Sequence, residues 1–213
     1  MNFWSFVARN RFEIATLTLE HLWIVAFSTL LAMVVGIPLG ILITRKRSLH
    51  KPVIAAANII QTVPSLALFG FLLPAPWIGE RAERLAILAL MLYALLPLIR
   101  NTYVGITGVD RATVEAARGM GLTDWQLLYK VELPLAASVI LAGIRVALVI
   151  SIGLATIAAA IGAGGLGELI FRGLAMVNNA VILAGAIPAA LMALIADTLL
   201  GWLEKRFSPQ RTA

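Results

Sequence analysis

Long apolar segments recur along the chain and constrain its fold more than any other feature. A helix needs about 20 mostly apolar residues to cross the roughly 30 Å hydrocarbon core of a bilayer. Apolar residues fill 61% of the 213 positions and the mean hydropathy is +0.94, so a soluble fold would expose large, aggregation-prone patches. The sequence therefore predicts an all-α membrane protein with about five transmembrane helices. These are expected at His21–Thr44, Pro52–Leu73, Leu85–Tyr103, Leu135–Ile161 and Ala180–Leu203.

The segments divide the chain into one membrane domain with short extensions. Residues 1–20 mix aromatic side chains with Arg and Glu, which is typical of an interfacial helix lying at the headgroups. Residues 21–205 form the predicted transmembrane domain, and residues 206–213 form a predicted cytoplasmic tail. The domain includes a polar loop at residues 104–134 that is too hydrophilic to cross the bilayer.

Lysine and arginine are distributed unevenly between the two sets of loops. Eleven of the 17 basic residues follow the first, third or fifth segment, five lie on the opposite side, and Arg145 lies within a segment. Loops rich in Lys and Arg usually face the cytoplasm. The pattern predicts a membrane protein with its N-terminus outside and its C-terminus and polar loop in the cytoplasm.

Several function classes are disfavoured by what the sequence lacks. The net charge of +6 does not indicate nucleic-acid binding, because the basic residues occur in short runs between apolar segments. The chain has no cysteine, and its two histidines form no metal-ligand pattern. It has neither a phosphate-binding G-x-x-x-x-G-K-[ST] loop nor a G-x-S-x-G nucleophile elbow. We therefore expect no catalytic site, no metal and no cofactor on this chain.

The polar loop carries the sequence signals of two short helices joined by a glycine turn. Asp110 is a suitable N-cap for the first helix, and Gly121 favours the turn that follows it. Thr123 and Gln126 have the spacing of a capping box at the start of a second helix, which is predicted to end before Pro134. Such a helical hairpin suits a docking site for another protein.

The spacing of residues within this loop follows a known family signature. Glu115-Ala116-Ala117 is followed by three residues, Gly121, nine residues, Val131, one residue and Leu133-Pro134. This pattern resembles the EAA signature of permease subunits of binding-protein-dependent ABC importers, with Val131 in place of the usual isoleucine. In that family the loop helix docks in a groove of the ATPase subunit and passes its closure to the spans. The resemblance thus implies ATPase-coupling roles for Glu115, Ala116, Ala117, Gly121, Leu133 and Pro134. Packing within the loop is the alternative for the two alanines and the glycine.

The resemblance extends over roughly residues 20–205. The stretches QTVPSLALFGFLLP at 61–74, LYALLPLIRNTYVGI at 92–106 and IGAGGLGELIFRGL at 161–174 resemble the osmoprotectant branch, which imports glycine betaine, carnitine and choline. This implies a permease of the bacterial inner membrane that forms the translocation path beside a second, identical or homologous permease subunit. It also implies an ATPase subunit dimer that binds ATP and Mg²⁺, and an extracytoplasmic substrate-binding protein. Membrane lipid is the remaining partner, and no nucleic acid is expected.

Polar side chains inside the predicted spans are costly in lipid and therefore mark candidate sites. Arg145 has Asp197 as a candidate partner. It is interpreted either as a gate or cavity charge, or as a structural ion pair or a snorkelling arginine at the inner interface. The glycine-rich run at 162–167 is expected to turn into a short external helix at 166–176 that either meets the binding protein or simply connects two spans. Residues that either line the pathway or make ordinary interhelical hydrogen bonds are Gln61, Thr62, Ser65, Tyr93, Asn101 and Arg145.

Other functions stay open at this point. A permease for another small solute, such as the amino acid methionine, would share the EAA loop. An ATP-independent channel or a membrane scaffold would share the apolar composition but would not need the EAA spacing. The tethering of the loop to spans at both ends argues against a DNA-binding helix-turn-helix. A co-purifying ATPase would distinguish the importer from the channel or scaffold.

Overall fold

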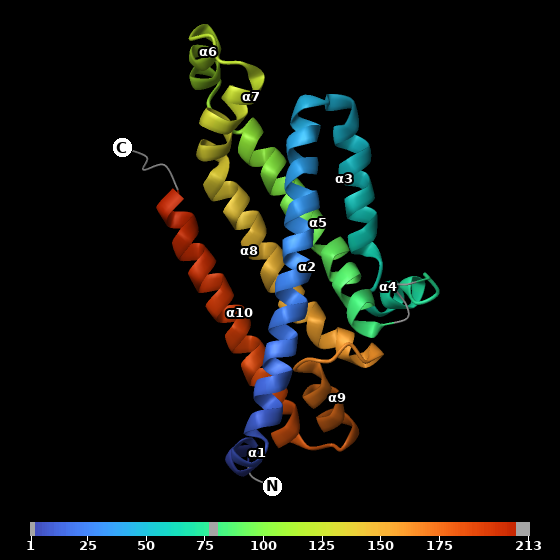
Figure 1. Ribbon diagram of the computed structural model, residues 1–213. Coiled ribbons are helices and arrows are strands. Elements are labelled where there is room, and N and C mark those ends of the chain that lie inside the picture. Colours follow the sequence, from blue (N-terminus) through green and yellow to red (C-terminus); the bar gives the residue numbers. More distant parts are fainter. Residues whose placement is uncertain (1–2, 77–80, 208–213) are drawn as a thin grey trace.

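A computed structural model describes residues 3–76 and 81–207 of the chain, and their regular structure is entirely helical (Figure 1). Long helices run side by side, with α6 and α7 at one end of the bundle and α1 and α9 at the other. The predicted all-α fold is confirmed.

Most of the predicted tail lies outside the described residues, and Arg206 and Phe207 belong to the last helix. The elements are α1 (Phe3–Arg9), α2 (Arg11–Arg45), α3 (Arg47–Thr62), α4 (Ser65–Leu72), α5 (Ala82–Thr107), α6 (Arg111–Gly119), α7 (Asp124–Leu127), the π-helical turn η1 (Leu128–Glu132), α8 (Leu133–Ala158), the 3₁₀ turn η2 (Ala159–Ile161), α9 (Gly167–Ala175) and α10 (Asn179–Phe207).

Four helices of the described chain are long and apolar enough to cross a membrane: α2, α5, the continuous run Asp124–Ile161 that contains α8, and α10. The pair α3 and α4 makes a fifth span if the two are counted together, although they bend by 102° at their junction. The predicted number of about five spans is therefore confirmed. Buried apolar side chains from α2, α4, α5 and α8 form the largest core cluster.

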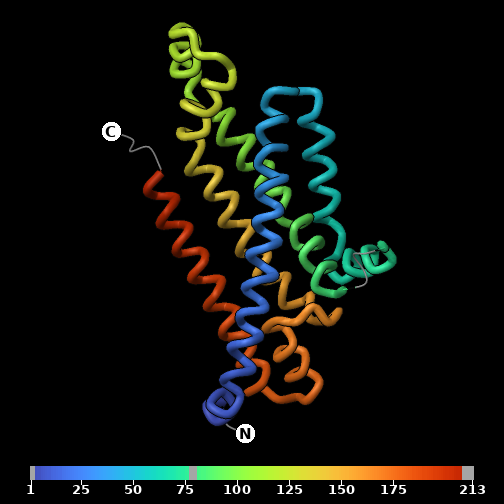
Figure 2. The backbone as a smooth tube through the Cα atoms, viewed as in Figure 1, coloured from blue at the N-terminus to red at the C-terminus, as the bar shows by residue number. Residues whose placement is uncertain are grey.

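The second predicted segment is broken at Pro64. Proline forces the preceding residue into an extended conformation, and Val63 accordingly has ψ 128°. The break frees backbone groups, which a membrane protein must satisfy internally. The Tyr93 hydroxyl donates a hydrogen bond to the Val63 carbonyl, and Gln61 Nε2 donates to the Tyr93 carbonyl at 2.9 Å. Figure 2 shows the chain leaving the direction of α3 at this point.

Helix α2 differs from the predicted segmentation, which ended an N-terminal interfacial segment at Glu20. The helix begins at Arg11 and passes through Glu20 without interruption. No glycine or proline stands between these residues to stop it. The acidic groups on this first part have partners near α9, since Glu13 accepts from Arg172 at 2.8 Å and Glu20 accepts from the Gly165 amide at 3.2 Å.

Helices α2 and α5 approach closely where α2 carries two glycines one turn apart. A Cβ added to Gly36 would lie 2.9 Å from Leu98 Cβ, and one added to Gly40 would lie 2.6 Å from Thr102 Cβ. Leu98 and Thr102 are both fully buried on α5. This is the G-x-x-x-G arrangement that allows transmembrane helix backbones to come into contact.

Candidate coupling loop and polar groups of the membrane domain

The first loop helix, α6, begins as the sequence predicted. Asp110 Oδ2 accepts hydrogen bonds from the backbone amide and the hydroxyl of Thr113, both at 3.1 Å. These bonds hold the pKa of Asp110 below its usual value, and the bond from the backbone amide has the largest effect. The N-cap role predicted for Asp110 is confirmed.

The turn and the second capping signal are also confirmed. Gly121 has φ +82°, a left-handed conformation that is costly for residues with a side chain. The Gln126 backbone amide donates a hydrogen bond to Thr123 Oγ1 at 3.3 Å, and Gln126 Oε1 accepts one from the Thr123 backbone amide at 3.0 Å. These two bonds form the predicted capping box. We call residues 108–132, which contain α6, α7 and η1, the hairpin lobe.

The EAA residues occupy different environments in the hairpin lobe. Glu115 and Ala116 are exposed on α6, whereas Ala117 is 2% exposed and its carbonyl accepts from the Leu122 amide. Gly121 is exposed at the turn. Hence Glu115, Ala116 and Gly121 are accessible to a partner, while Ala117 packs within the lobe.

The expectation that the second loop helix ends before Pro134 is wrong. Helix α7 continues through η1 into α8, so residues 124–161 form one uninterrupted helical run. Within a regular α-helix, the Pro134 ring would clash with the carbonyl of Lys130. The π turn widens the backbone, and the Leu133 amide bonds to the Leu128 carbonyl five residues back. Leu133 is half-buried and Pro134 exposed at this junction.

An ion pair that the sequence analysis missed joins the hairpin lobe to α2. Glu132 lies in η1 and is 5% exposed. Arg45, the last residue of α2, donates from Nη1 to Glu132 Oε1 at 3.2 Å and from Nη2 to Oε2. Bidentate pairing satisfies both carboxylate oxygens and fixes their relative orientation. No sequence motif links these two residues.

A second charged cluster lies between α8 and α10. Arg145 Nε is 3.6 Å from Asp197 Oδ1, the partner expected from the sequence, and its Nη1 is 3.6 Å from Glu204 Oε2. Sequence reasoning missed Glu204, although it follows Asp197 by about two helical turns and therefore shares its helix face. The cation thus lies between two carboxylates of α10.

The other residues proposed for the pathway do not converge on one site. Gln61 and Tyr93 meet at the α3–α4 break, as described above. Thr62 bonds to the Ile59 carbonyl of its own helix at 2.8 Å, and Asn101 bonds to the Pro97 carbonyl of α5 at 2.8 Å. Ser65 is the first residue of α4. The structure therefore groups Gln61 with Tyr93 but not with Asn101 or Arg145.

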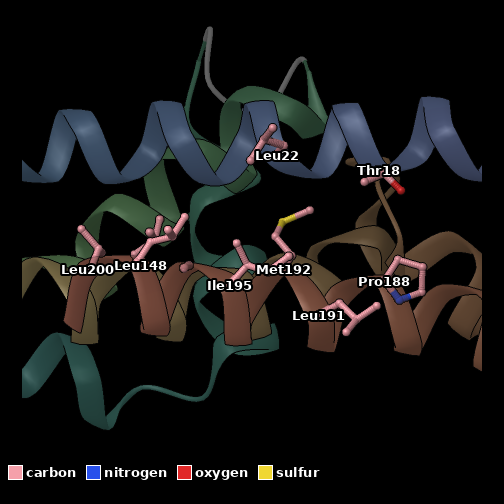
Figure 3. Close-up of a pocket in the computed structure, with 10 residues that line it drawn as sticks. Thr18, Leu22, Leu148, Pro188, Leu191, Met192, Ile195 and Leu200 are labelled. Carbon is pink, nitrogen blue, oxygen red and sulfur yellow. The ribbon is translucent and has the colours of Figure 1, made fainter. Parts of the chain in front are cut away.

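Two cavities differ in chemistry. An apolar groove of about 610 Å³ runs between α2 and α10 (Figure 3), where Leu22 and Thr18 face Leu191, Met192 and neighbouring apolar side chains. A groove of this kind suits acyl chains or another helix better than a charged solute.

The second cavity, about 340 Å³, lies near the α9 end and has a polar lining. Glu20, Glu83, Glu168 and Trp23 contribute to it, and Trp23 Nε1 donates to Glu83 Oε1 at 3.1 Å. Carboxylates and an indole face are chemically suited to a quaternary ammonium group. Sequence reasoning did not find this cavity because its side chains come from three separate parts of the chain.

The family described as "Binding-protein-dependent transport system inner membrane component" matches residues 36–209, a range that includes the hairpin lobe and the spans around it. The chain belongs to this family. It is therefore a multi-pass inner-membrane permease component, and the resemblance seen in the EAA spacing is confirmed.

Curated relatives resemble the permease over most of its length. The glycine betaine/carnitine/choline transport system permease protein OpuCD of Bacillus subtilis (strain 168) is 52% identical over 191 residues, which cover 89% of this chain and 82% of the relative. The osmoprotectant import permease protein OsmW of Salmonella typhimurium is 43% identical over 203 residues, covering 94% of both chains. These similarities confirm the resemblance to the osmoprotectant branch.

Solved structures support the same fold. A permease chain from an inward-facing MetNI methionine ABC transporter has a TM-score of 0.81 with 23% identity, covering 89% of this permease and 94% of that chain. An amino acid ABC transporter crystallised with histidines has a TM-score of 0.78 with 19% identity, covering 97% and 99%. At these identities the comparison establishes the architecture alone.

Proposed function

We propose that this permease forms the translocation path for osmoprotectants such as glycine betaine, carnitine and choline. The observation that carries the proposal is the 52% identity to a permease named for these solutes, over 89% of the chain. An amino acid permease is the alternative, but the methionine transporter shares only 23% identity and supports the fold alone. An ATP-independent channel or scaffold would not need the EAA residues of the hairpin lobe.

The polar cavity near α9 supports this choice of solute. Betaine, carnitine and choline all carry a quaternary ammonium group, which cannot donate a hydrogen bond and is held by charge and by aromatic faces. Glu20, Glu168 and Trp23 line a cavity with both properties. A cationic centre entering from the α9 end would encounter this lining before the apolar interior of the bundle.

For the partners, we propose that α6 docks on an ATPase subunit. Glu115 and Ala116 are exposed on α6, which lies at the tip of the bundle (Figure 1). A pair of ATPase subunits would hold the ATP and Mg²⁺, because no phosphate-binding loop occurs in the permease sequence. A second permease subunit would complete the pathway, and an extracytoplasmic binding protein would deliver solute near α9.

This arrangement requires the hairpin lobe to face the cytoplasm. The basic run Arg45–Arg47 lies at the same end of the bundle as the hairpin lobe, in agreement with the positive-inside rule. The N-terminus would then lie outside and the C-terminus inside.

The test is mild-detergent purification of the tagged permease with its partners, followed by uptake into proteoliposomes. We expect a Walker-motif ATPase to co-purify, and Glu115→Ala and Gly121→Val to reduce its recovery. Gly119→Ala is the matched control, because a Cβ there meets no other atom within 4 Å. ATP-driven uptake of betaine, choline or carnitine in preference to methionine would support the proposal. A permease that purifies alone and shows ATP-independent solute flux would refute it in favour of a channel.

A further inference from the structure

The connection between the hairpin lobe and the membrane domain is narrow. Helix α6 packs against α7 and the π turn η1, and η1 continues directly into α8. A displacement of α6 by a partner therefore reaches the bundle through this turn and through the short link at residues 108–110, which joins α6 to α5. The contacts of η1 determine whether a further span, with no covalent link to the lobe, moves with it.

Two different contacts hold η1 against those spans. The first is apolar: buried Leu128 clusters with Ile106 of α5 and Ala136 of α8, and partly buried Ile41 of α2 packs against this cluster. The second is the ion pair between Glu132 of η1 and Arg45 at the end of α2. Apolar contact is non-directional and tolerates sliding, whereas a bidentate guanidinium–carboxylate pair fixes both distance and orientation. The ion pair thus constrains the position of η1 more tightly than the apolar contact does.

The burial of Glu132 makes the pair specific. Its side chain is 6% exposed and that of Arg45 is 33% exposed. A carboxylate removed from water needs a partner that satisfies both oxygens, and Arg45 provides it. The pair lies at the very end of α2, next to the turn at Lys46 that leads into α3. A displacement delivered here acts at the end of a 35-residue helix.

We propose that Arg45 and Glu132 are positioning residues for energy coupling, which tie the hairpin lobe to α2 so that the two move as one body. This role rests on the proposed function, because it assumes that an ATPase moves the lobe. The role requires neither residue to touch the solute or the nucleotide. The pair gives α2 a share of the displacement that the covalent links deliver to α5 and α8.

The decisive variant removes both partners at once. Arg45→Met alone leaves a buried, unpaired carboxylate and is expected to misfold, whereas Arg45→Met/Glu132→Leu removes the buried charge together with its partner. We expect the double variant to assemble and to hydrolyse ATP, but to take up less solute per ATP by about fivefold or more, the lower range of typical coupling between sites. Glu13→Gln is the matched control, because it breaks an ion pair at the opposite end of α2 and should leave uptake per ATP unchanged.

A distance measurement tests the same idea without relying on the folding of a variant. The chain has no cysteine, so spin labels can be placed at Lys46→Cys and Tyr129→Cys, both exposed and on either side of the pair. We expect one narrow distance distribution that is the same without nucleotide and in an ATP-trapped state. A distance that differs between the two states would overturn the proposal.

The outcomes separate this inference from the proposed function. Wild-type uptake per ATP in the folded double variant would overturn the positioning role alone. Absence of ATP-driven uptake in the wild-type complex would overturn the proposed function, and this inference with it. Loss of uptake per ATP in the double variant, with ATPase activity and thermal stability retained, would support it.

Discussion

The close approach of α2 and α5 predicts a large effect for one added methyl group. In Gly40→Ala the new Cβ would lie 2.6 Å from Thr102 Cβ and 3.0 Å from the Ile99 carbonyl oxygen. Carbon atoms in contact prefer separations of about 3.5–4.0 Å, so the overlap approaches 1 Å. Neither neighbouring atom can rotate away, because one is a Cβ and the other belongs to the backbone. We therefore expect the helices to separate, at a cost of about 1–3 kcal/mol.

Thermal unfolding in detergent, followed by circular dichroism or dye fluorescence, measures this cost. A loss of 1–3 kcal/mol corresponds to a fall in Tm of roughly 2–12 °C for a chain of this size. Gly153→Ala is the matched control within α8, since its Cβ would meet no other atom within 4 Å. Alanine is the better helix former by up to about 1 kcal/mol, so this control should not lower Tm. A Gly40→Ala variant as stable as the wild type would refute the packing argument.

The reciprocal change gives a stricter version of the test. In Gly40→Ala/Thr102→Gly the contact still contains one Cβ, which now belongs to the opposite helix. We expect the double variant to be more stable than the sum of the two single losses predicts. Additive losses would mean that the two residues do not share one contact.

Three further results are expected. Hydrogen bonds from Thr113 lower the folded-state pKa of Asp110, so ionised Asp110 should stabilise the start of α6 at pH values above the ordinary carboxyl pKa, and this stabilisation should be lost as the pH falls through the lowered pKa. A spin label on α6 should become more mobile over that pH range in the wild type, and its mobility should change less with pH in Asp110→Asn. Gly121→Ala should destabilise the hairpin lobe by about 1–2 kcal/mol, measured by local protease sensitivity, because φ +82° is unfavourable for alanine. Arg145→Met should lower Tm more than Asp197→Asn or Glu204→Gln does. Each of these two carboxylate variants should cost no more than about 1 kcal/mol, because the ion pairs are partly exposed. An unchanged Tm when both carboxylates are neutralised would exclude a stabilising role for the cluster.

Local rules predicted the hairpin lobe well. Asp110, Gly121 and the Thr123–Gln126 box each act over a few residues, so their effect on the backbone depends little on the rest of the fold. The same applies to the spans, whose existence follows from length and polarity. The short helix expected after the glycine-rich run is likewise present as α9.

Features that depend on tertiary packing were not predicted. The bend at Pro64 is stabilised by the side chains of Gln61 and Tyr93, and Tyr93 is 32 residues from Gln61 in the sequence. Arg45 and Glu132 are 87 residues apart, and only the packing of α2 against the hairpin lobe brings them together. The continuation of α7 into α8 needed a π turn, for which Pro134 was the only local sign and was interpreted as a stop.

The length of α2 has a practical consequence for following this protein at work. Its 35 residues extend about 52 Å at 1.5 Å per residue, beyond the roughly 40–45 Å of a bilayer with its headgroups. A single helix of this length is long enough to reach water on both sides of the membrane. In a cysteine-free chain, a single thiol introduced at Arg11 or at Lys46 could be modified by a membrane-impermeant reagent from one side only. The two labelling patterns would report the orientation of α2 in intact cells.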